Sequence, residues 1–268
     1  MIGAIIGDIV GSRFEWDNHR SKDFDLFAPN CEATDDSIMT LAVAEAILAC
    51  DGNYQALGEA AVRSMQRLGR KYPNAGYGGS FGKWLHQSDP KPYNSYGNGA
   101  AMRVSPCAWA AGSFGEACLL ARKVTEVSHN HEEGLKGAEA TTAAIWMARQ
   151  GEGIPAIREY INRHYYPLNF TLDSIRYNYQ FDESSQGTVP QAIVAFLEST
   201  DFEDAIRGAV SIGGDSDTLA AITGSIAQAY YGVPEHIRQQ ALPYLDQGLR
   251  TILFNFERQF PLSRVVAQ

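Results

Sequence analysis

The sequence has few cysteines, few basic side chains and no long apolar run. The four cysteines are Cys31, Cys50, Cys107 and Cys118. None belongs to a Cys-x-x-Cys pair, so neither a zinc ribbon nor a disulfide-stapled domain is indicated. The first apolar stretch, residues 1–7, has no basic flank and ends at Asp8, well short of a signal peptide or a membrane span. We therefore expect a cytoplasmic protein with reduced cysteines and no membrane association.

Basic side chains are also outnumbered by acidic ones. The 22 Lys and Arg residues against 31 Asp and Glu residues give a net charge of −9, which opposes nonspecific binding to nucleic acids and acidic lipids. An anionic ligand would need local hydrogen-bond donors. The hydrophobic content of 45% is typical of globular proteins, and 268 residues can bury one full core. We expect a monomer with a single domain over residues 1–268.

Signals for β-strands are scarce as well. Alternation of β-branched and aromatic residues is weak outside residues 156–179, and that segment has no hairpin dipeptide. Alanine-rich runs predict helices instead. These runs cover residues 37–49, 56–70, 100–111, 115–127, 134–149, 189–198, 202–210 and 218–230, and residues 235–256 are expected to form one long helix or two shorter ones. The sequence therefore predicts an all-α fold in which the connecting loops carry the function.

Two short acidic segments each come directly before an apolar helical run. They are Thr34-Asp35-Asp36-Ser37 and Gly213-Gly214-Asp215-Ser216-Asp217-Thr218. Helix capping alone explains part of either segment, because Asp, Ser and Thr are preferred N-cap residues and the helix dipole favours carboxylates there. Capping needs only one or two of these oxygens, however, and neighbouring carboxylates repel one another. A divalent cation would offset the surplus charge, and ligands that offer only oxygen favour Mg²⁺, with Mn²⁺ as a substitute.

A third acidic position, Glu15, follows the glycine-rich N-terminal segment. Taken alone, Glu15 is a solvated charge. Joined to the four aspartates of the two acidic segments it would bring five carboxylates into one site, and two divalent ions would neutralise four of the five charges. The pattern favours a two-metal site, an arrangement that stabilises both attacking and leaving oxygens.

Two further motifs could bind an anionic ligand. Residues 95–103 lead from a loop into a predicted helix, so their small side chains could expose backbone N–H groups to a phosphate, although an ordinary Asn-Gly turn explains them too. The segment Ser128-His129-Asn130-His131 joins two predicted helices, where a histidine could donate to a phosphate or ribose oxygen or simply cap and pack. Nearby aromatic side chains could stack on a purine or belong to the core; they are Tyr77, Phe81, Trp84, Tyr93 and Tyr96.

In the order of these motifs the chain resembles the ADP-ribosylglycohydrolase family. The matching segments are residues 7–15, 34–37, 97–103, 128–129 and 213–218, which span almost the whole chain. The resemblance implies a compact orthogonal bundle of helices with a binuclear Mg²⁺ centre in a central cleft. It implies metal ligands at Thr34, Asp35, Asp36, Asp215, Asp217 and Thr218. It also implies substrate contacts from Gly97, Asn98, Gly99, Ala100, Met102 and Arg103 at the diphosphate, and from His129.

The activity that the resemblance implies is Mg²⁺-dependent hydrolysis of the glycosidic bond between ADP-ribose and an ADP-ribosylated protein or small molecule. Glu15 and Asp36 would handle the protons of this reaction. The acceptor stays open, because residues 147–188 contain no matching motif and are expected to shape the leaving-group pocket. Two alternatives also stay open: a protein that binds ADP-ribose without cleaving it, and a Mg²⁺-dependent nucleotide pyrophosphohydrolase, which would release AMP.

Overall fold

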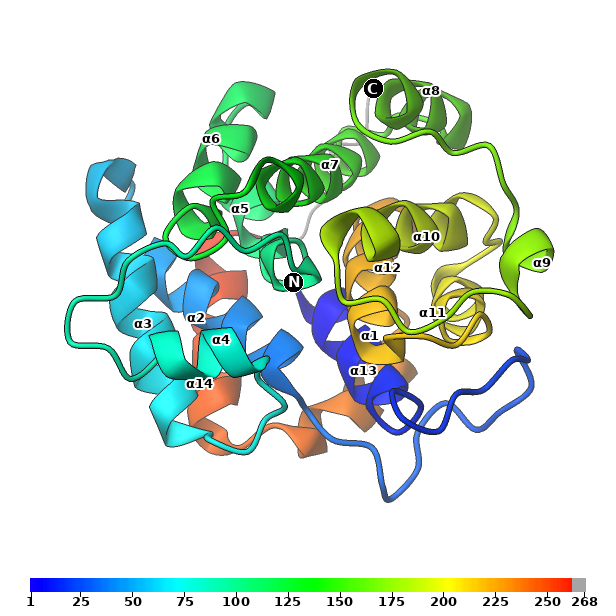
Figure 1. The fold of residues 1–268 in the computed structure, drawn as a ribbon, viewed down its shortest axis with the longest axis horizontal. Helices are drawn as coiled ribbons and strands as arrows, with labels where there is room; N and C mark the ends of the chain where they lie inside the picture. The colour runs from blue at the N-terminus through cyan, green and yellow to red at the C-terminus, as the bar shows by residue number, and fades with distance from the viewer. Residues whose placement is uncertain (262–268) are drawn as a thin grey trace.

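Helices α1 (Ile2–Ser12) and α12 (Ser216–Tyr231) form the centre of the molecule. The computed structural model describes residues 1–261, so residues 262–268 of the predicted domain lie outside the described residues. Figure 1 shows the two helices packed side by side with the other helices around them. All of α12 from Ser216 to Ala229 is buried. The pair is therefore the internal support on which the rest of the chain packs.

The surrounding elements are helical throughout. They are α2 (Asp35–Ala49), α3 (Leu57–Lys71), α4 (Gly79–Trp84), α5 (Ser105–Ala110), α6 (Phe114–Thr125), α7 (Glu132–Arg149), α8 (Ile154–His164), α9 (Leu172–Ile175), α10 (Ser185–Leu197), α11 (Phe202–Val210), α13 (Glu235–Ala241) and α14 (Gln247–Gln259), with 3₁₀ turns η1 (Tyr54–Ala56), η2 (Asn98–Ala100) and η3 (Leu242–Tyr244). Between residues 1 and 261 the only β-type pairing is an isolated bridge between Gly97 and Ser184. The predicted all-α fold is confirmed. No helix in this part of the chain combines the length and apolar character that crossing a bilayer requires.

The predicted helices agree with the structure except in one place. Residues 235–256 form two helices, α13 and α14, separated by η3, and residues 156–179 form α8 and α9 rather than strands. The prediction of a helix over residues 100–111 is wrong in its first half, because the chain makes the η2 turn there and α5 begins only at Ser105. Pro106 lies in the first turn of α5, a position that tolerates proline and marks a helix start.

A row of glycines lets α1 approach α12 unusually closely. Gly3, Gly7 and Gly11 recur every fourth residue and so share one face of α1. A methyl group at any of them would overlap a backbone carbonyl oxygen of α12. The overlapped oxygens belong, in the same order, to Gly224, Ala220 and Ser216. The two backbones touch, and Asp8 is thereby brought beside the first turn of α12.

Candidate metal centre and substrate cavity

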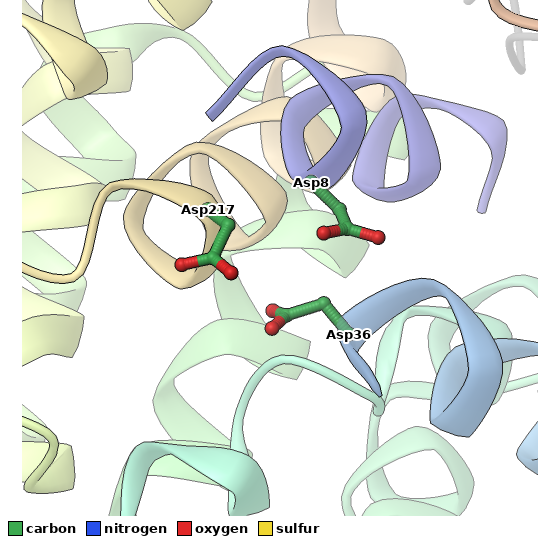
Figure 2. A group of neighbouring side chains, drawn as sticks. All are labelled: Asp8, Asp36 and Asp217. Atoms are coloured by element: carbon green, nitrogen blue, oxygen red, sulfur yellow. The ribbon is translucent and has the colours of Figure 1, made fainter. Parts of the chain in front are cut away.

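Three buried carboxylates from three different helices meet at the start of α12. Asp8 comes from α1, Asp36 from the first turn of α2 and Asp217 from the first turn of α12. One oxygen of each lies within 4.8 Å of the others, and Figure 2 shows the three side chains directed into the space between their helices. The fold therefore brings together carboxylates, those of Asp8 and Asp217, that are more than 200 residues apart in the sequence.

A second carboxylate group adjoins the first. Glu15, Asp215 and Asp217 also place one oxygen each within 4.8 Å of one another. Glu15 is half-buried in the turn after α1, whereas both aspartates are buried. Asp217 belongs to both groups, so they form one continuous acidic centre of the kind that two adjacent cations could share.

Asp36 has a free oxygen inside this centre. Its Oδ2 accepts a hydrogen bond of 3.1 Å from the Thr218 hydroxyl, but its Oδ1 is buried and has no hydrogen-bond partner. A buried carboxylate oxygen without a partner is costly unless a cation or water fills the vacant direction. The donor set around it consists of carboxylates and threonine hydroxyls, which fits a hard cation such as Mg²⁺.

Asp8 supports the start of α2, and the sequence analysis did not select it as a site residue. Its Oδ1 accepts from the Thr34 hydroxyl at 2.6 Å, and its Oδ2 accepts from the backbone N–H groups of Thr34 at 2.9 Å and Ser37 at 3.0 Å. Thr34 is itself the N-cap of α2, accepting from Asp36 N–H. Asp8 thus fixes the turn that presents Asp36. The signal in the sequence is an aspartate inside an otherwise apolar helix.

Asp35 and Asn98 lie at the edge of the acidic centre. Asp35 is half-buried and lines the cavity but belongs to neither close carboxylate group. Its backbone N–H donates to the Ala75 carbonyl at 2.7 Å. Asn98 turns its amide toward the acidic centre, where Nδ2 donates to Asp215 Oδ2 at 2.6 Å and to Thr188 Oγ1 at 3.0 Å. Asn98 therefore orients a carboxylate in this structure.

The acidic centre opposes full ionisation of its members. Burial, followed by the charges of Asp8 and other neighbouring carboxylates, raises the pKa of Asp36 well above its ordinary value. Burial, followed by the charges of Asp215 and Asp36, does the same to the pKa of Asp217. Burial raises the pKa of Asp8 to about 6, and burial with the nearby charge of Asp215 raises the pKa of Glu15 to about 7. A bound cation would reverse these shifts by stabilising the ionised carboxylates.

The glycine motif forms the 3₁₀ turn η2 and not the first turn of an α-helix, since α5 begins only at Ser105. Gly97 precedes η2, and the N–H groups of Asn98 and Met102 are already bonded, to the Glu183 carbonyl at 2.8 Å and the Asn98 carbonyl at 3.1 Å. Gly97, Gly99 and Met102 still line the cavity, whereas Ala100 is fully buried behind the turn. The N–H groups of Asn98 and Met102 are therefore not free to bind an anion at this turn.

His129 provides a side-chain donor position at this turn. It is buried between α6 and α7, lines the cavity, and lies against Gly97 and Gly99. Burial and the charge of Arg103 lower the pKa of His129 well below its ordinary value, which favours the neutral ring. Arg103 is fully buried behind it.

Aromatic side chains line much of the cavity, which has a volume of about 740 Å³, within the usual range for small-molecule sites. Of the predicted aromatic residues, Tyr77, Phe81, Tyr93 and Tyr96 line it. Trp84 is buried and stacks on Phe81 with 5.2 Å between ring centroids. Sequence analysis missed a stacked pair at the rim, Trp16 and Phe181, whose centroids are 5.1 Å apart.

Comparisons with known proteins match most of this chain. A family model described as ADP-ribosylglycohydrolase matches residues 1–259. The ADP-ribosylhydrolase ARH3 of Homo sapiens is 27% identical and is matched over 93% of this chain and 90% of its own length. The ADP-ribosylarginine hydrolase Tri1 of Pseudomonas putida (strain GB-1) is 26% identical over 95% of this chain and 76% of its own. A solved structure titled ADP-ribosylglycohydrolase-related protein complex shares the fold, with a TM-score of 0.71, 23% identity, and coverage of 96% of this chain and 95% of that one.

Proposed function

Because the chain belongs to the ADP-ribosylglycohydrolase family of hydrolases, we propose that it cleaves the glycosidic bond between ADP-ribose and an acceptor in a Mg²⁺-dependent reaction. The observation that carries this proposal is the acidic centre at the wall of the cavity, where two carboxylate groups share Asp217. Neither helix capping nor core packing requires so many buried carboxylates at one point.

We assign two ions, Mg²⁺ or in its place Mn²⁺, to this centre. The proposed ligands are Thr34, Asp35, Asp36, Asp215, Asp217 and Thr218. The vacant Oδ1 of Asp36 supports the assignment. Asp8, whose two oxygens already accept hydrogen bonds from the start of α2, acts as support for the ligands. The ions would supply positive charge that polarises the oxygen atoms bound to them.

Glu15 and Asp36 are the proposed proton carriers. Glu15 is half-buried at the cavity wall, and its carboxylate, which is not one of the proposed metal ligands, can exchange a proton with a water molecule in the cavity. During hydrolysis the water oxygen bonds to the anomeric carbon of the ribose, and the bond from that carbon to the acceptor breaks. One carboxylate takes a proton from the water, and the departing acceptor gains a proton, so charge is conserved.

The rest of the ligand would extend along the cavity. The proposed diphosphate contacts are Gly97, Asn98, Gly99, Met102 and His129, among which the side chain of His129 is the donor that the structure supports best. Ala100 and Arg103, which the family resemblance also implied, are fully buried, and we propose that they support this surface from behind. Tyr93 and Tyr96 offer aromatic faces in the same cavity on which a purine could stack.

The rim of the cavity favours a planar, positively charged acceptor. The exposed fractions of Trp16 and Phe181 are 80% and 40%, and the two rings stack on one another beside Glu15. Glu183 adds a carboxylate to the same rim. An aromatic face next to carboxylates attracts a guanidinium more strongly than a hydroxyl group. ADP-ribosylated arginine is therefore the acceptor that we propose first.

A panel of substrates tests both the proposed metal-dependent cleavage and the proposed arginine acceptor. Release of ADP-ribose would be measured from conjugates of Arg, Ser, Asn, a nucleic-acid end and free NAD, with Mg²⁺, with Mn²⁺ and with EDTA. We expect metal-dependent release that is fastest from the arginine conjugate, and a Trp16→Ala variant that raises KM for that conjugate alone. Release of AMP would identify a pyrophosphohydrolase instead, and tight binding of ADP-ribose without turnover would identify a non-catalytic binding protein.

A further inference from the structure

Arg103 is a fully buried cation whose side chain has no carboxylate partner in the described part of the chain. Its guanidinium lies over the Phe81 ring, 5.4 Å from the centroid. Its Nε and Nη1 have no hydrogen-bond partner, and only Nη2 makes contacts. A buried charge with so little compensation is expensive, so its position calls for a function.

The contacts of Nη2 lead to His129. Nη2 donates to Ser128 Oγ at 2.8 Å and lies 3.4 Å from His129 Nδ1. Ser128 Oγ and His129 Nδ1 are 2.8 Å apart. A guanidinium has donors only, so Ser128 Oγ accepts from Arg103 and its own hydroxyl hydrogen is available for Nδ1. A proton on Nδ1 would instead point at the N–H group of Arg103 Nη2 and at Ser128 Oγ, which already accepts a hydrogen bond from Arg103. This tautomer is therefore disfavoured.

We propose that Arg103 is a positioning residue that, through Ser128, holds His129 in the neutral tautomer protonated on Nε2. The ring then presents one N–H donor to the turn at Gly97 and Gly99. This inference deepens the proposed function, since the acceptor for that donor would be a diphosphate oxygen of ADP-ribose. A neutral donor binds an anion without adding a second charge next to the buried guanidinium.

The two glycines support this direction for the donor. A Cβ atom at Gly99 would lie 3.2 Å from His129 Nε2, and one at Gly97 would lie 3.5 Å from it. Neither glycine has a positive φ, so their backbone conformations do not require glycine. The absence of a side chain at both positions instead leaves space in front of Nε2.

The tautomer can be read directly, without any substrate. Long-range ¹H–¹⁵N correlation spectra of the full chain with ¹⁵N-labelled histidine, near neutral pH, distinguish protonated from unprotonated ring nitrogens. A His129→Gln spectrum assigns the signal. We expect the proton on Nε2 in the native chain and in Arg103→Lys, and a mixture of both tautomers in Arg103→Met. Should Arg103→Met fail to fold, Ser128→Ala breaks the same relay. A proton on Nδ1 in the native chain overturns the proposal.

The donor role is tested by calorimetry with ADP-ribose. His129→Leu should weaken binding roughly tenfold to a hundredfold, because it removes a hydrogen bond to a charged group. His129→Gln, which keeps an amide donor near the position of Nε2, should weaken binding less. Equal losses in both variants overturn the donor role. If the native chain shows the Nε2 tautomer but does not bind ADP-ribose, the proposed function fails while the assignment of the tautomer stands.

Discussion

At the scale of single residues, the carboxylates of the acidic centre differ from ordinary helix caps in what they leave unsatisfied. An N-cap aspartate such as Asp201 accepts a hydrogen bond from the first turn of its helix and is otherwise exposed. Asp36 is buried, and one of its oxygens has no partner. The difference separates a residue that completes a helix from one that is free to bind a cation, as we propose.

We therefore expect Asp35→Ala and Asp217→Ala to lower turnover by roughly three orders of magnitude while leaving the helical circular dichroism spectrum nearly unchanged. Asp201→Ala is the matched control. It should cost about 1 kcal/mol of stability through the lost cap and leave turnover intact. Extensive unfolding of both site variants would show that these aspartates serve the fold rather than the reaction.

Two residues of the acidic centre should make the metal-free protein less stable as the pH rises. The pKa values of Asp8 and Glu15 rise on folding from 3.8 and 4.5 to about 6 and about 7, through burial in both cases. The folded state then binds more protons than the unfolded state between about pH 4 and pH 7, so stability falls as the pH rises through this window. Bound Mg²⁺ favours the ionised carboxylates and should oppose the trend.

Thermal melts with EDTA and with Mg²⁺, at about pH 5 and about pH 7.5, measure this effect. We expect the EDTA sample to melt at a lower temperature at the higher pH, and Mg²⁺ to raise Tm more there than at pH 5. A Mg²⁺ effect of equal size at both pH values would mean that the ion does not bind these carboxylates.

The sequence predicts those candidate site residues that lie in a recognisable local motif. The aspartates before α2 and α12 and the motif around His129 could be predicted from the residue types beside helix starts. Asp8 stands out as an aspartate within an apolar helix, but its role could not be predicted, because its hydrogen-bond partners are 26 and 29 residues away. Trp16 and Phe181 meet only after folding, so nothing in either local segment predicts their stacking.

At the scale of helices, the contact between α1 and α12 decides where the acidic centre forms. Alanine-rich composition predicts most helices, since propensity and burial agree there. It fails at residues 100–104, because residues 96–98 are hydrogen-bonded to residues 183–185 and the chain makes the 3₁₀ turn η2 there. Such contacts between distant segments override local propensity, which is why the shape of the glycine loop could not be read from the sequence.

Gly7→Ala tests the backbone contact of the two central helices. The added methyl group would overlap the Ala220 carbonyl, and overpacking of this kind costs about 1–3 kcal/mol. Gly115→Ala, at an exposed helical site with no atom near the added carbon, should be neutral or slightly stabilising. Urea unfolding of both variants provides the comparison, and equal stabilities would contradict the close approach.

At the scale of the whole molecule, a single core cluster draws residues from α1 through α14. We therefore propose one domain and a monomer, and we expect one unfolding transition whose midpoint does not depend on protein concentration. Melts followed by far-ultraviolet circular dichroism and by tryptophan fluorescence should coincide. Two separate midpoints would indicate two domains.

The glycine row of α1 restricts how far apart the carboxylates of the acidic centre can lie. Where side chains separate two helices, a substitution is absorbed by repacking. Between α1 and α12 no side chain intervenes on the α1 side, so the spacing of Asp8 and Asp217 follows from the thickness of the peptide backbone itself. A substitution in the core at Gly3 or Gly224 would push the two backbones apart and so change the distance between the Asp8 and Asp217 carboxylates, roughly one to two helical turns away.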